Sequence, residues 1–388
     1  APLLRPETIA TLLETHRASG SAATLLTARL ADPSGYGRVV RSAGGDVTAI
    51  VEHKDATPEI RAIDEINAGM YAFDAASLRA ALGRLTSHNA QGEEYLTDVV
   101  GAFVGDGLSV AAIVAEDAAD TEGVNDRAQL ARAGAVLRDR LTDRAMRAGV
   151  TIVDPASTWV DASVILEPDA VIEPFTQLTG ATVVHAGAVV GPYSRLTDTV
   201  VGAGATVLAS ISIGAEIGES ASIGPYSYLR PGTVIGRGAK VGTYVETKNA
   251  RIGDDSKVPH LSYVGDADIG ERTNIGAASI FVNYDGVQKH HASVGNDVRV
   301  GADNMLVAPV RIGDGAYTAA GSVIDSDVPP GALGVGRARQ RNIEGWVERK
   351  RSGTRSAESA RQARESGDQA QRPTHDPSDP QSPQGAQQ

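Results

Sequence analysis

An aliphatic residue occupies every sixth position of the sequence between residues 160 and 196. These positions are Val160, Leu166, Ile172, Leu178, Val184, Val190 and Leu196. This period fits neither an α-helix nor a simple alternating strand, but it is typical of a solenoid in which three short strands close one triangular coil. We therefore expect a prism of stacked coils with these aliphatic side chains inside.

The repeat continues, with single-residue shifts, as far as Ile312. The residue after the aliphatic position is often glycine, as at Gly236 and Gly253, which suits a corner with little room for a side chain. Periodicity alone is as compatible with a structural rod as with an enzyme, because function is carried by sites and not by folds. The residues that interrupt the repeat must therefore indicate the function.

The composition excludes several classes of protein. The chain has 388 residues, which suggests two domains plus additional segments. Its 36 Lys and Arg against 48 Asp and Glu give a net charge of -12, which disfavours non-specific binding to nucleic acid. It contains no Cys, which excludes disulfides and thiolate sites and fits a cytoplasmic protein. We find no apolar run of about eighteen residues and no signal peptide, so neither a membrane span nor secretion is indicated.

Residues 1–127 alternate helix-like and strand-like patterns, which is typical of an α/β layer. We expect strands at residues 23–30, 47–55, 66–74 and 110–115 and helices at residues 1–17 and 96–108. The turns between these elements contain residues that a ligand would require. The candidates are Gly37, Glu52, Asn67 and Asn125. Each is a weak signal alone, because a Gly-rich turn is more often only a turn.

In this order the four turn residues resemble the sugar-1-phosphate nucleotidyltransferases, which have a Rossmann-like sheet. The resemblance implies that Gly37, Glu52 and Asn67 hold a sugar nucleotide, and that Asn125 contacts it and is a ligand of the catalytic Mg²⁺. The family's Gly-rich loop for the triphosphate and its metal-binding Asp would precede position 1. We therefore expect an incomplete domain that is inactive in nucleotidyl transfer as it stands.

Two further segments flank the solenoid, which we place at residues 149–347. Residues 128–148 carry Leu130 and Leu137 on one side at helical spacing, which predicts a helical arm between the two domains. Residues 348–388 are rich in Ser, Gln, Pro, Arg and Asp, with too little apolar content to offset the entropy of ordering. This composition predicts a disordered tail.

Charged and polar residues interrupt the solenoid repeat in one dense stretch. They are Arg230, Glu246, Lys248, His260, Tyr263 and Asn274. Their separations are close to the length of one coil, so they can stack on adjacent coils about 5 Å apart. The repeat is then suspended between Ile275 and Val294, where a loop offers Asn283, Tyr284, Asp285 and Lys289. We expect a functional site here.

The motifs LRPG, VETKNA, VPHLSYVGDADIG, TNIGA and FVNYDG carry a second resemblance, which covers about residues 1 to 347. The chain resembles the bacterial bifunctional N-acetylglucosamine-1-phosphate uridyltransferases and glucosamine-1-phosphate N-acetyltransferases. This resemblance implies a left-handed parallel β-helix that works as a homotrimer. It also implies acetyl transfer from acetyl-CoA to glucosamine 1-phosphate. In the complete protein, Mg²⁺-dependent uridylyl transfer from UTP would then give UDP-N-acetylglucosamine for cell-wall precursors.

Acetyl transfer to an amine needs a base, and a neutral imidazole is suited to this near pH 7. We assign this role to His260, and we expect Glu246 to orient His260 or the substrate amine. Arg230 and Lys248 would bind the sugar 1-phosphate. The resemblance adds Tyr263, Asn274 and Lys289 to that contact. On the acetyl-CoA side it adds Ala277, Asn283, Tyr284, Ala302, Ala320 and Arg337, although Ala302 replaces the Ser that is usual in the family's GSD turn.

Two other functions remain open. A hexapeptide-repeat metalloenzyme of the carbonic anhydrase type would need three well-placed His, and the solenoid offers His185, His260, His290 and His291 without a paired pattern. A non-catalytic scaffold or ice-binding rod would present flat Thr-rich faces, whereas the exposed positions here are mixed and charged. We assign no role to His290 and His291.

Overall fold

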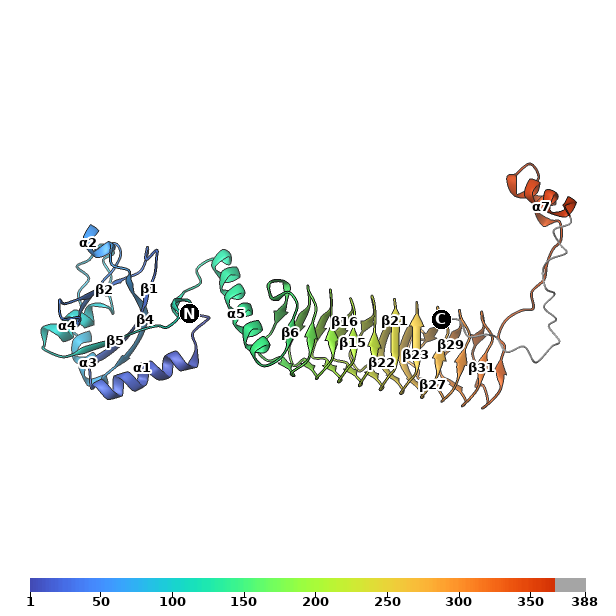
Figure 1. The fold of residues 1–388 in the computed structure, drawn as a ribbon, viewed down its shortest axis with the longest axis horizontal. Coiled ribbons are helices and arrows are strands. Elements are labelled where there is room, and N and C mark those ends of the chain that lie inside the picture. Colours follow the sequence, from blue (N-terminus) through green and yellow to red (C-terminus); the bar gives the residue numbers. More distant parts are fainter. Residues whose placement is uncertain (367–388) are drawn as a thin grey trace. The chain divides into compact units, whose positions relative to one another are not determined.

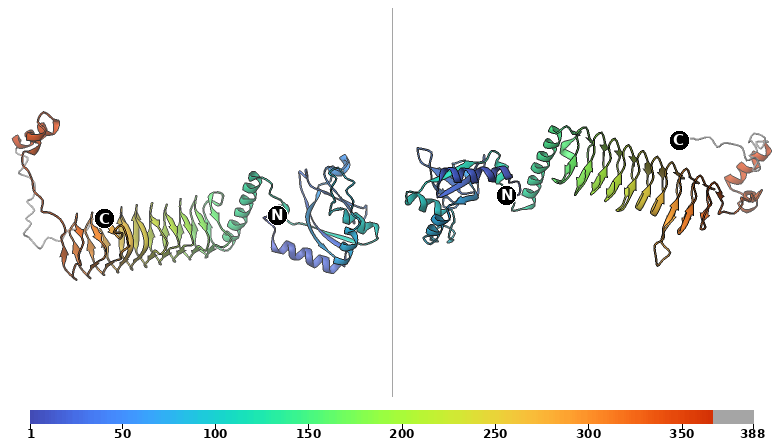
Figure 2. Two further views of the ribbon diagram at one scale, coloured as in Figure 1. Left: turned by 180° about the vertical axis from the view of Figure 1, so that it is seen from behind. Right: turned by 90° about the horizontal axis from the view of Figure 1, so that it is seen from below.

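The computed structural model describes residues 1–366 (Figure 1). The chain divides into two compact units between Val335 and Gly336. The first unit contains an α/β domain, a long helix and a stack of β coils, in that order along the chain (Figures 1 and 2). The nucleotidyltransferase-like sheet and the parallel β-helix that we predicted are therefore both present.

A five-stranded mixed sheet forms the centre of the α/β domain, with the order β3-β2-β4-β1-β5. Strand β1 (Ala23–Arg29) lies between the antiparallel β4 (Glu65–Phe73) and the parallel β5 (Val110–Val114). The short β2 (Arg38–Arg41) and β3 (Val47–Val51) form an antiparallel pair at one edge. The strands expected near 23–30, 47–55, 66–74 and 110–115 are confirmed. Strand β2 was not predicted, because its apolar run is only two residues long.

Helices cover this sheet. They are α1 (Pro6–Ser19), α2 (Pro58–Arg61), α3 (Ala75–Leu82) and α4 (Asp98–Gly105). Helix α4 buries Val99, Val100 and Phe103 in the main hydrophobic cluster of the domain. The helices expected at 1–17 and 96–108 are confirmed, although α1 begins five residues later and ends two residues later than expected and α4 is shorter at both ends. A 3-10 turn, η1 (Ala118–Thr121), ends the domain.

The expected helical arm is α5 (Arg127–Arg147). It begins with a capping box, in which the side chain of Asp126 accepts a hydrogen bond from the Gln129 backbone and the Gln129 side chain bonds back. Arg140 on this helix lies 2.9 Å from the carboxylate of Asp120, which is fully buried and also accepts a hydrogen bond from Arg5 at 2.9 Å. This buried ion pair ties the arm to the end of the α/β domain.

A second 3-10 turn, η2 (Pro155–Ser157), lies in the first coil of the β-helix, and the coils contribute parallel strands to three faces. Face 1 consists of β7 (Trp159–Val160), β10 (Gln177–Thr179), β13 (Arg195–Thr197), β16 (Ile211–Ile213), β19 (Tyr228–Leu229), β22 (Glu246–Ile252), β24 (Tyr263–Ile269), β26 (Ile280–Val282), β29 (Met305–Val307) and β32 (Val323–Ile324).

Face 2 consists of the second halves of β22 and β24 together with β8 (Ile165–Leu166), β11 (Val183–Val184), β14 (Val200–Val201), β17 (Glu216–Ile217), β20 (Val234–Ile235), β27 (Ala292–Val294) and β30 (Val310–Ile312). Because β22 and β24 continue around the corner, faces 1 and 2 belong to one 17-stranded sheet.

Face 3 is a separate 11-stranded sheet. It consists of β6 (Thr151–Ile152), β9 (Val171–Ile172), β12 (Val189–Val190), β15 (Thr206–Val207), β18 (Ser222–Ile223), β21 (Lys240–Thr243), β23 (Lys257–His260), β25 (Asn274–Ile275), β28 (Arg299–Val300), β31 (Tyr317–Thr318) and β33 (Leu333–Gly334). The repeated aliphatic side chains, such as Leu178 and Leu196, are fully buried in one continuous core.

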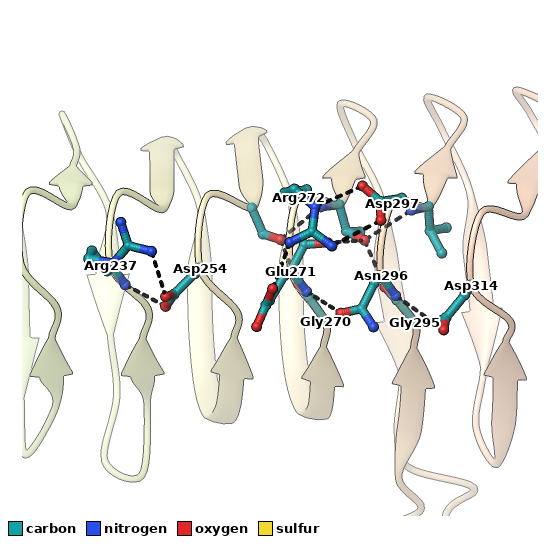
Figure 3. A network of polar contacts seen from close by, with 12 residues as sticks. Arg237, Asp254, Gly270, Glu271, Arg272, Gly295, Asn296, Asp297 and Asp314 are labelled. Atoms are coloured by element: carbon teal, nitrogen blue, oxygen red, sulfur yellow. Dashed lines mark hydrogen bonds and ion pairs between the residues drawn. The ribbon is translucent and has the colours of Figure 1, made fainter.

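The corner between faces 2 and 3 shows why glycine recurs. A Cβ atom on Gly253 would lie only 2.6 Å from the backbone of Gly270 in the next coil. Side chains at this corner also bond to the preceding coil: Asp254 accepts a hydrogen bond from the backbone of Arg237 at 2.8 Å, and Asn296 accepts one from Glu271 at 2.7 Å (Figure 3). The distance between successive coils therefore depends on two features of this corner. Glycines allow the backbones to approach, and short Asp and Asn side chains accept hydrogen bonds from the preceding coil.

We predicted disorder from residue 348 onward, and this is wrong for its first part. The structure has two helices here, α6 (Trp346–Lys350) and α7 (Arg355–Glu365). Thr354 caps α7 by accepting a hydrogen bond from the backbone of Ala357, and Arg364 lies 3.5 Å from Glu348. Ala, Arg, Glu and Gln are good helix formers, which the reading of overall composition overlooked. Residues 367–388 of the predicted tail lie outside the described residues.

We predict that Gly253→Ala destabilises the β-helix far more than Gly315→Ala. A Cβ at Gly315 meets nothing within 4 Å but sits at a φ of +64°, which costs about 1 kcal/mol. The added methyl at Gly253 must push coils apart, at roughly 3 kcal/mol. Thermal unfolding followed by circular dichroism measures the difference. Equal decreases of the midpoint temperature would contradict this account of the corner.

Candidate active site

The residues singled out on the solenoid lie mainly along face 1 and at its two corners. In β22 and β24, Glu246 is in register with Tyr263, and Lys248 with Gly265. Tyr228 of β19 precedes Glu246 in the same column. The three coils that carry these strands therefore place their chemistry side by side, as the coil-length spacing predicted.

Arg230 and Glu246 form an ion pair in the middle of this region. The Arg230 Nη1 lies 2.8 Å from Glu246 Oε1, and both side chains are partly exposed. The hydrogen bond to Glu246 raises the pKa of Arg230 above its ordinary value, so the guanidinium stays charged. We expected Glu246 to orient His260 or the substrate. Among residues 1–366, however, no hydrogen bond joins Glu246 to the His260 imidazole, and the carboxylate bonds to Arg230 instead.

A second cluster lies at the corner between faces 1 and 2. Close contact with the ammonium group of Lys289 lowers the pKa of Lys248. Asp266 accepts hydrogen bonds from Asn249 at 2.7 Å and from Asn283 at 2.5 Å. Burial opposes ionisation of Asp266, but these bonds and the two Lys charges outweigh it, and its pKa lies below the ordinary value. The corner therefore holds two adjacent cations beside one ionised carboxylate.

Tyr263 packs against this second cluster. A Cβ atom on Gly265 would lie 2.4 Å from the Tyr263 hydroxyl and 2.8 Å from Asn283 Nδ2. A side chain at position 265 would displace the phenol or the Asn283 amide, so the glycine lets these two groups approach each other. Sequence analysis missed Asp266 and Asn249. Their separation of one coil was the signal that could have found them.

The corner between faces 3 and 1 carries His260. The backbone of Ala278 donates to the His260 carbonyl at 3.2 Å, that of Asp303 to the Ala277 carbonyl at 2.7 Å, and that of Gly321 to the Ala302 carbonyl at 2.9 Å. His260, Ala277 and Ala302 thus occupy equivalent positions in successive coils, and Ala320 follows them. We call these three alanines the alanine column. His260 is exposed and lies next to this column of small side chains.

Some candidates lie elsewhere. Asn274 is on face 3, in register with Lys257 and Arg299, and so not on the face of Glu246 and Tyr263. Arg337 belongs to the second compact unit.

The loop of residues 283–291 projects from the stack between β26 and β27 (Figure 2). Tyr284 and Lys289 form a bridge at its base. His290 Nε2 lies 2.7 Å from Asp285 Oδ2, which helps to hold the pKa of Asp285 well below its usual range. His291 Nε2 lies 3.1 Å from Asp268 Oδ2. These pairs shape the loop and its base.

In the α/β domain, three of the four predicted residues meet. The backbone of Asn67 donates to the Gly37 carbonyl at 2.9 Å, and a Cβ on Gly37 would lie 3.2 Å from Glu52 Oε1. Glu52 accepts a hydrogen bond from Thr97 at 3.1 Å, and the Asn67 amide bonds to Tyr71 at 2.7 Å. Sequence analysis missed these two supporting residues, which are hidden in an ordinary strand and helix start.

Asn125 is exposed next to the start of α5, and no hydrogen bond within residues 1–366 joins it to the other three. Its amide could give Mg²⁺ one oxygen. No group of three or more His, Asp or Glu side chains within residues 1–366 could hold a metal ion, so these residues do not form a complete magnesium site. No helix in residues 1–366 is both long and apolar enough to span a bilayer.

Comparisons with known proteins agree with the order of these parts. A family described as "Bacterial transferase hexapeptide (six repeats)" matches residues 214–249 and 291–326, and one described as "Nucleotidyl transferase" matches residues 4–162. "Bifunctional protein GlmU" of Streptomyces avermitilis is 59% identical over 359 residues, covering 92% of this chain and 74% of that protein. The protein of the same name from Corynebacterium glutamicum is 55% identical over 358 residues, with the same shares.

We predict that Lys289→Ala raises the pKa of Lys248 toward its ordinary value, because the neighbouring ammonium is removed. The lowered folded-state pKa means that the charged pair opposes folding at low pH. The destabilisation is lost as the pH rises from the Lys248 pKa of the folded state to that of the unfolded state. NMR titration of the Lys248 side chain measures the shift, with Lys240→Ala on face 3 as the control. An unchanged titration in Lys289→Ala would show that the two ammonium groups do not interact.

Proposed function

The chain belongs to the family of bifunctional GlmU proteins, and we propose that its β-helix transfers the acetyl group of acetyl-CoA to the amine of glucosamine 1-phosphate. The observation that carries the proposal is the arrangement around face 1. A cluster of cations at one corner suits a phosphate, and an exposed His beside the alanine column at the other corner suits a base and a thioester. The product, N-acetylglucosamine 1-phosphate, is the substrate of uridylyl transfer.

His260 is the proposed base. The substrate amine attacks the thioester carbonyl, so that the C–N bond forms and the C–S bond breaks, and His260 takes a proton from the amine and returns it to the CoA thiolate. An imidazole needs direct hydrogen-bond reach to the amine for this step. Glu246, paired with Arg230, is proposed to orient the substrate amine rather than the imidazole.

The sugar phosphate is proposed to bind at the cationic corner. Arg230 offers a planar pair of hydrogen-bond donors, and Lys248 and Lys289 each offer a positive charge. A bound phosphate dianion would reduce the repulsion between the two lysines. Tyr263 and Asn274 are proposed sugar contacts. Ala277, Ala302, Ala320, Asn283, Tyr284 and Arg337 are proposed for acetyl-CoA.

We further propose a homotrimer. Asn274 lies on face 3, whereas Glu246 and Tyr263 lie on face 1. A second copy that packs its face 3 against face 1 would bring all three to one substrate. Flat prism faces suit such cyclic packing.

For the α/β domain we propose that Gly37, Glu52, Asn67 and Asn125 contact UDP-N-acetylglucosamine, formed from UTP with Mg²⁺ in the complete protein. Because the described residues form no complete metal site, we derive no step through the ion. The route leads to cell-wall precursors, and we propose that the protein works in the cytoplasm, where acetyl-CoA is available.

We predict that His260→Ala lowers kcat for thiol release from acetyl-CoA by at least about a hundredfold with glucosamine 1-phosphate as acceptor, because the proton acceptor is lost. His185→Ala is the matched control, since His185 is a partly exposed β-helix His paired with Glu167 at 2.9 Å. An inactive parent, or an undiminished His260→Ala variant, would refute the proposed role and favour the scaffold alternative.

We predict a particle of about three times 40.1 kDa in solution. Size-exclusion chromatography with light scattering measures the mass directly. Mixing Asn274→Ala chains with Glu246→Ala chains, by unfolding and refolding together, should restore part of the activity if the site is shared between copies. A monomeric mass with full activity would exclude the shared site.

A further inference from the structure

We propose that Ser262 is a positioning residue, whose buried hydroxyl holds the peptide after His260 and thereby fixes the direction of the imidazole. This inference rests on the proposed role of His260 as base. It concerns a side chain that contacts neither substrate nor the imidazole. Its effect would reach the reaction only through the backbone of the corner.

The contacts of Ser262 are specific. Its side chain is buried at 4% exposure, and its Oγ donates to the His260 carbonyl oxygen at 2.7 Å. The Ser262 Oγ itself accepts a hydrogen bond from the backbone N–H of Ser279 at 3.2 Å. Between His260 and Ser262, Leu261 has a φ of +49°, in the left-handed region that is unfavourable for a residue with a Cβ. The hydroxyl bond therefore closes a strained turn.

This hydroxyl also links His260 to the neighbouring part of the site. The backbone of Ala278 donates to the His260 carbonyl at 3.2 Å, so the coil that contains Ala277 contacts the His260 corner twice. One contact passes through Ser262 and one is direct. Together they set the distance between His260 and the alanine column, where the thioester is proposed to lie.

The imidazole has no other restraint of this kind. Within residues 1–366, the rings of His16, His185, His290 and His291 each have a hydrogen-bond partner, whereas the His260 ring has none. Proton transfer requires the base and the amine within direct hydrogen-bond distance, and an error of about 1 Å can cost two orders of magnitude in rate. The backbone turn must therefore supply the orientation that side-chain contacts do not.

The chain offers a matched control three coils earlier in the same column. Ser210 is equally buried, and its Oγ donates to the Leu208 carbonyl at 2.7 Å and accepts from the backbone of Ser227 at 3.1 Å. These distances are nearly those of Ser262. Ser210 bonds to none of the residues assigned to the reaction, and two coils separate its coil from that of His260. The two serines therefore differ in that only the corner of Ser262 carries the proposed base.

The experiment compares Ser262→Ala, Ser210→Ala, Ser262→Thr and His260→Ala with the parent chain. Each variant is assayed for kcat, for KM of both substrates and for the midpoint of thermal unfolding. Both Ala variants leave a buried backbone N–H unpaired and should lose similar thermal stability. We expect Ser262→Ala to lose about tenfold in kcat with both KM values within about twofold. Ser210→Ala should retain kcat, and Ser262→Thr, which keeps the hydroxyl, should recover most of it.

Each other result has a definite meaning. Equal kcat values for Ser262→Ala and Ser210→Ala, or a loss confined to KM, would overturn the positioning role while leaving His260→Ala as an independent test of the base. An inactive parent or an active His260→Ala variant would overturn the proposed function and this inference with it. If Ser262→Ala does not fold, Ser262→Cys and Ser210→Cys, which weaken the same hydrogen bonds with little change in volume, are compared instead.

Discussion

Backbone hydrogen bonds between successive coils set the distances in the proposed acetyltransferase site. They bring residues about one coil apart in sequence to neighbouring positions, as with Glu246 and Tyr263 or Lys248 and Gly265. Parallel strands lie about 4.8 Å apart, so a side chain on one coil reaches only the coils directly before and after it. The glycine corner permits this spacing, because a Cβ at Gly253 would already touch the next backbone. The positions of the reactive side chains on face 1 therefore depend on corner glycines that carry no functional group.

Local charge must overcome the charge of the whole chain at this site. The net charge of -12 repels both proposed substrates, which carry phosphates. Arg230 and the pair Lys248 and Lys289 place three cations near the face, where Glu246 pairs with Arg230 and Asp266 lies beside the two lysines. The depressed pKa of Lys248 indicates that the free site is electrostatically unfavourable. A bound phosphate dianion would reduce the repulsion between the two ammonium groups. The affinity for the phosphate should therefore be higher than the net charge of the chain suggests.

The sequence allowed the fold to be predicted, together with the stacking of several candidate residues on neighbouring coils, but not which of these residues pair with one another. The six-residue period is visible in the sequence because most inward positions of the thin prism carry an aliphatic side chain, as at Leu178. By contrast, the Arg230–Glu246 pair required the register between coils, which places Glu246 opposite Tyr228 and not opposite Arg230. Helix α7 was missed because a polar composition suggested disorder, while capping by Thr354 and a run of good helix formers stabilise it. The sequence did not show that Asn274 lies on face 3, away from Glu246 and Tyr263 on face 1.

Strands β22 and β24 run through the corner between faces 1 and 2 without a break, while the strands of the preceding coils stop there. Each coil of such a stack contacts mainly its immediate neighbours. One complete coil could therefore be added or removed among the uninterrupted repeats before Ile211 without altering any distance among Arg230, Lys248 and His260. The length of the prism can thus change during evolution while the distances among the proposed catalytic and binding residues stay the same.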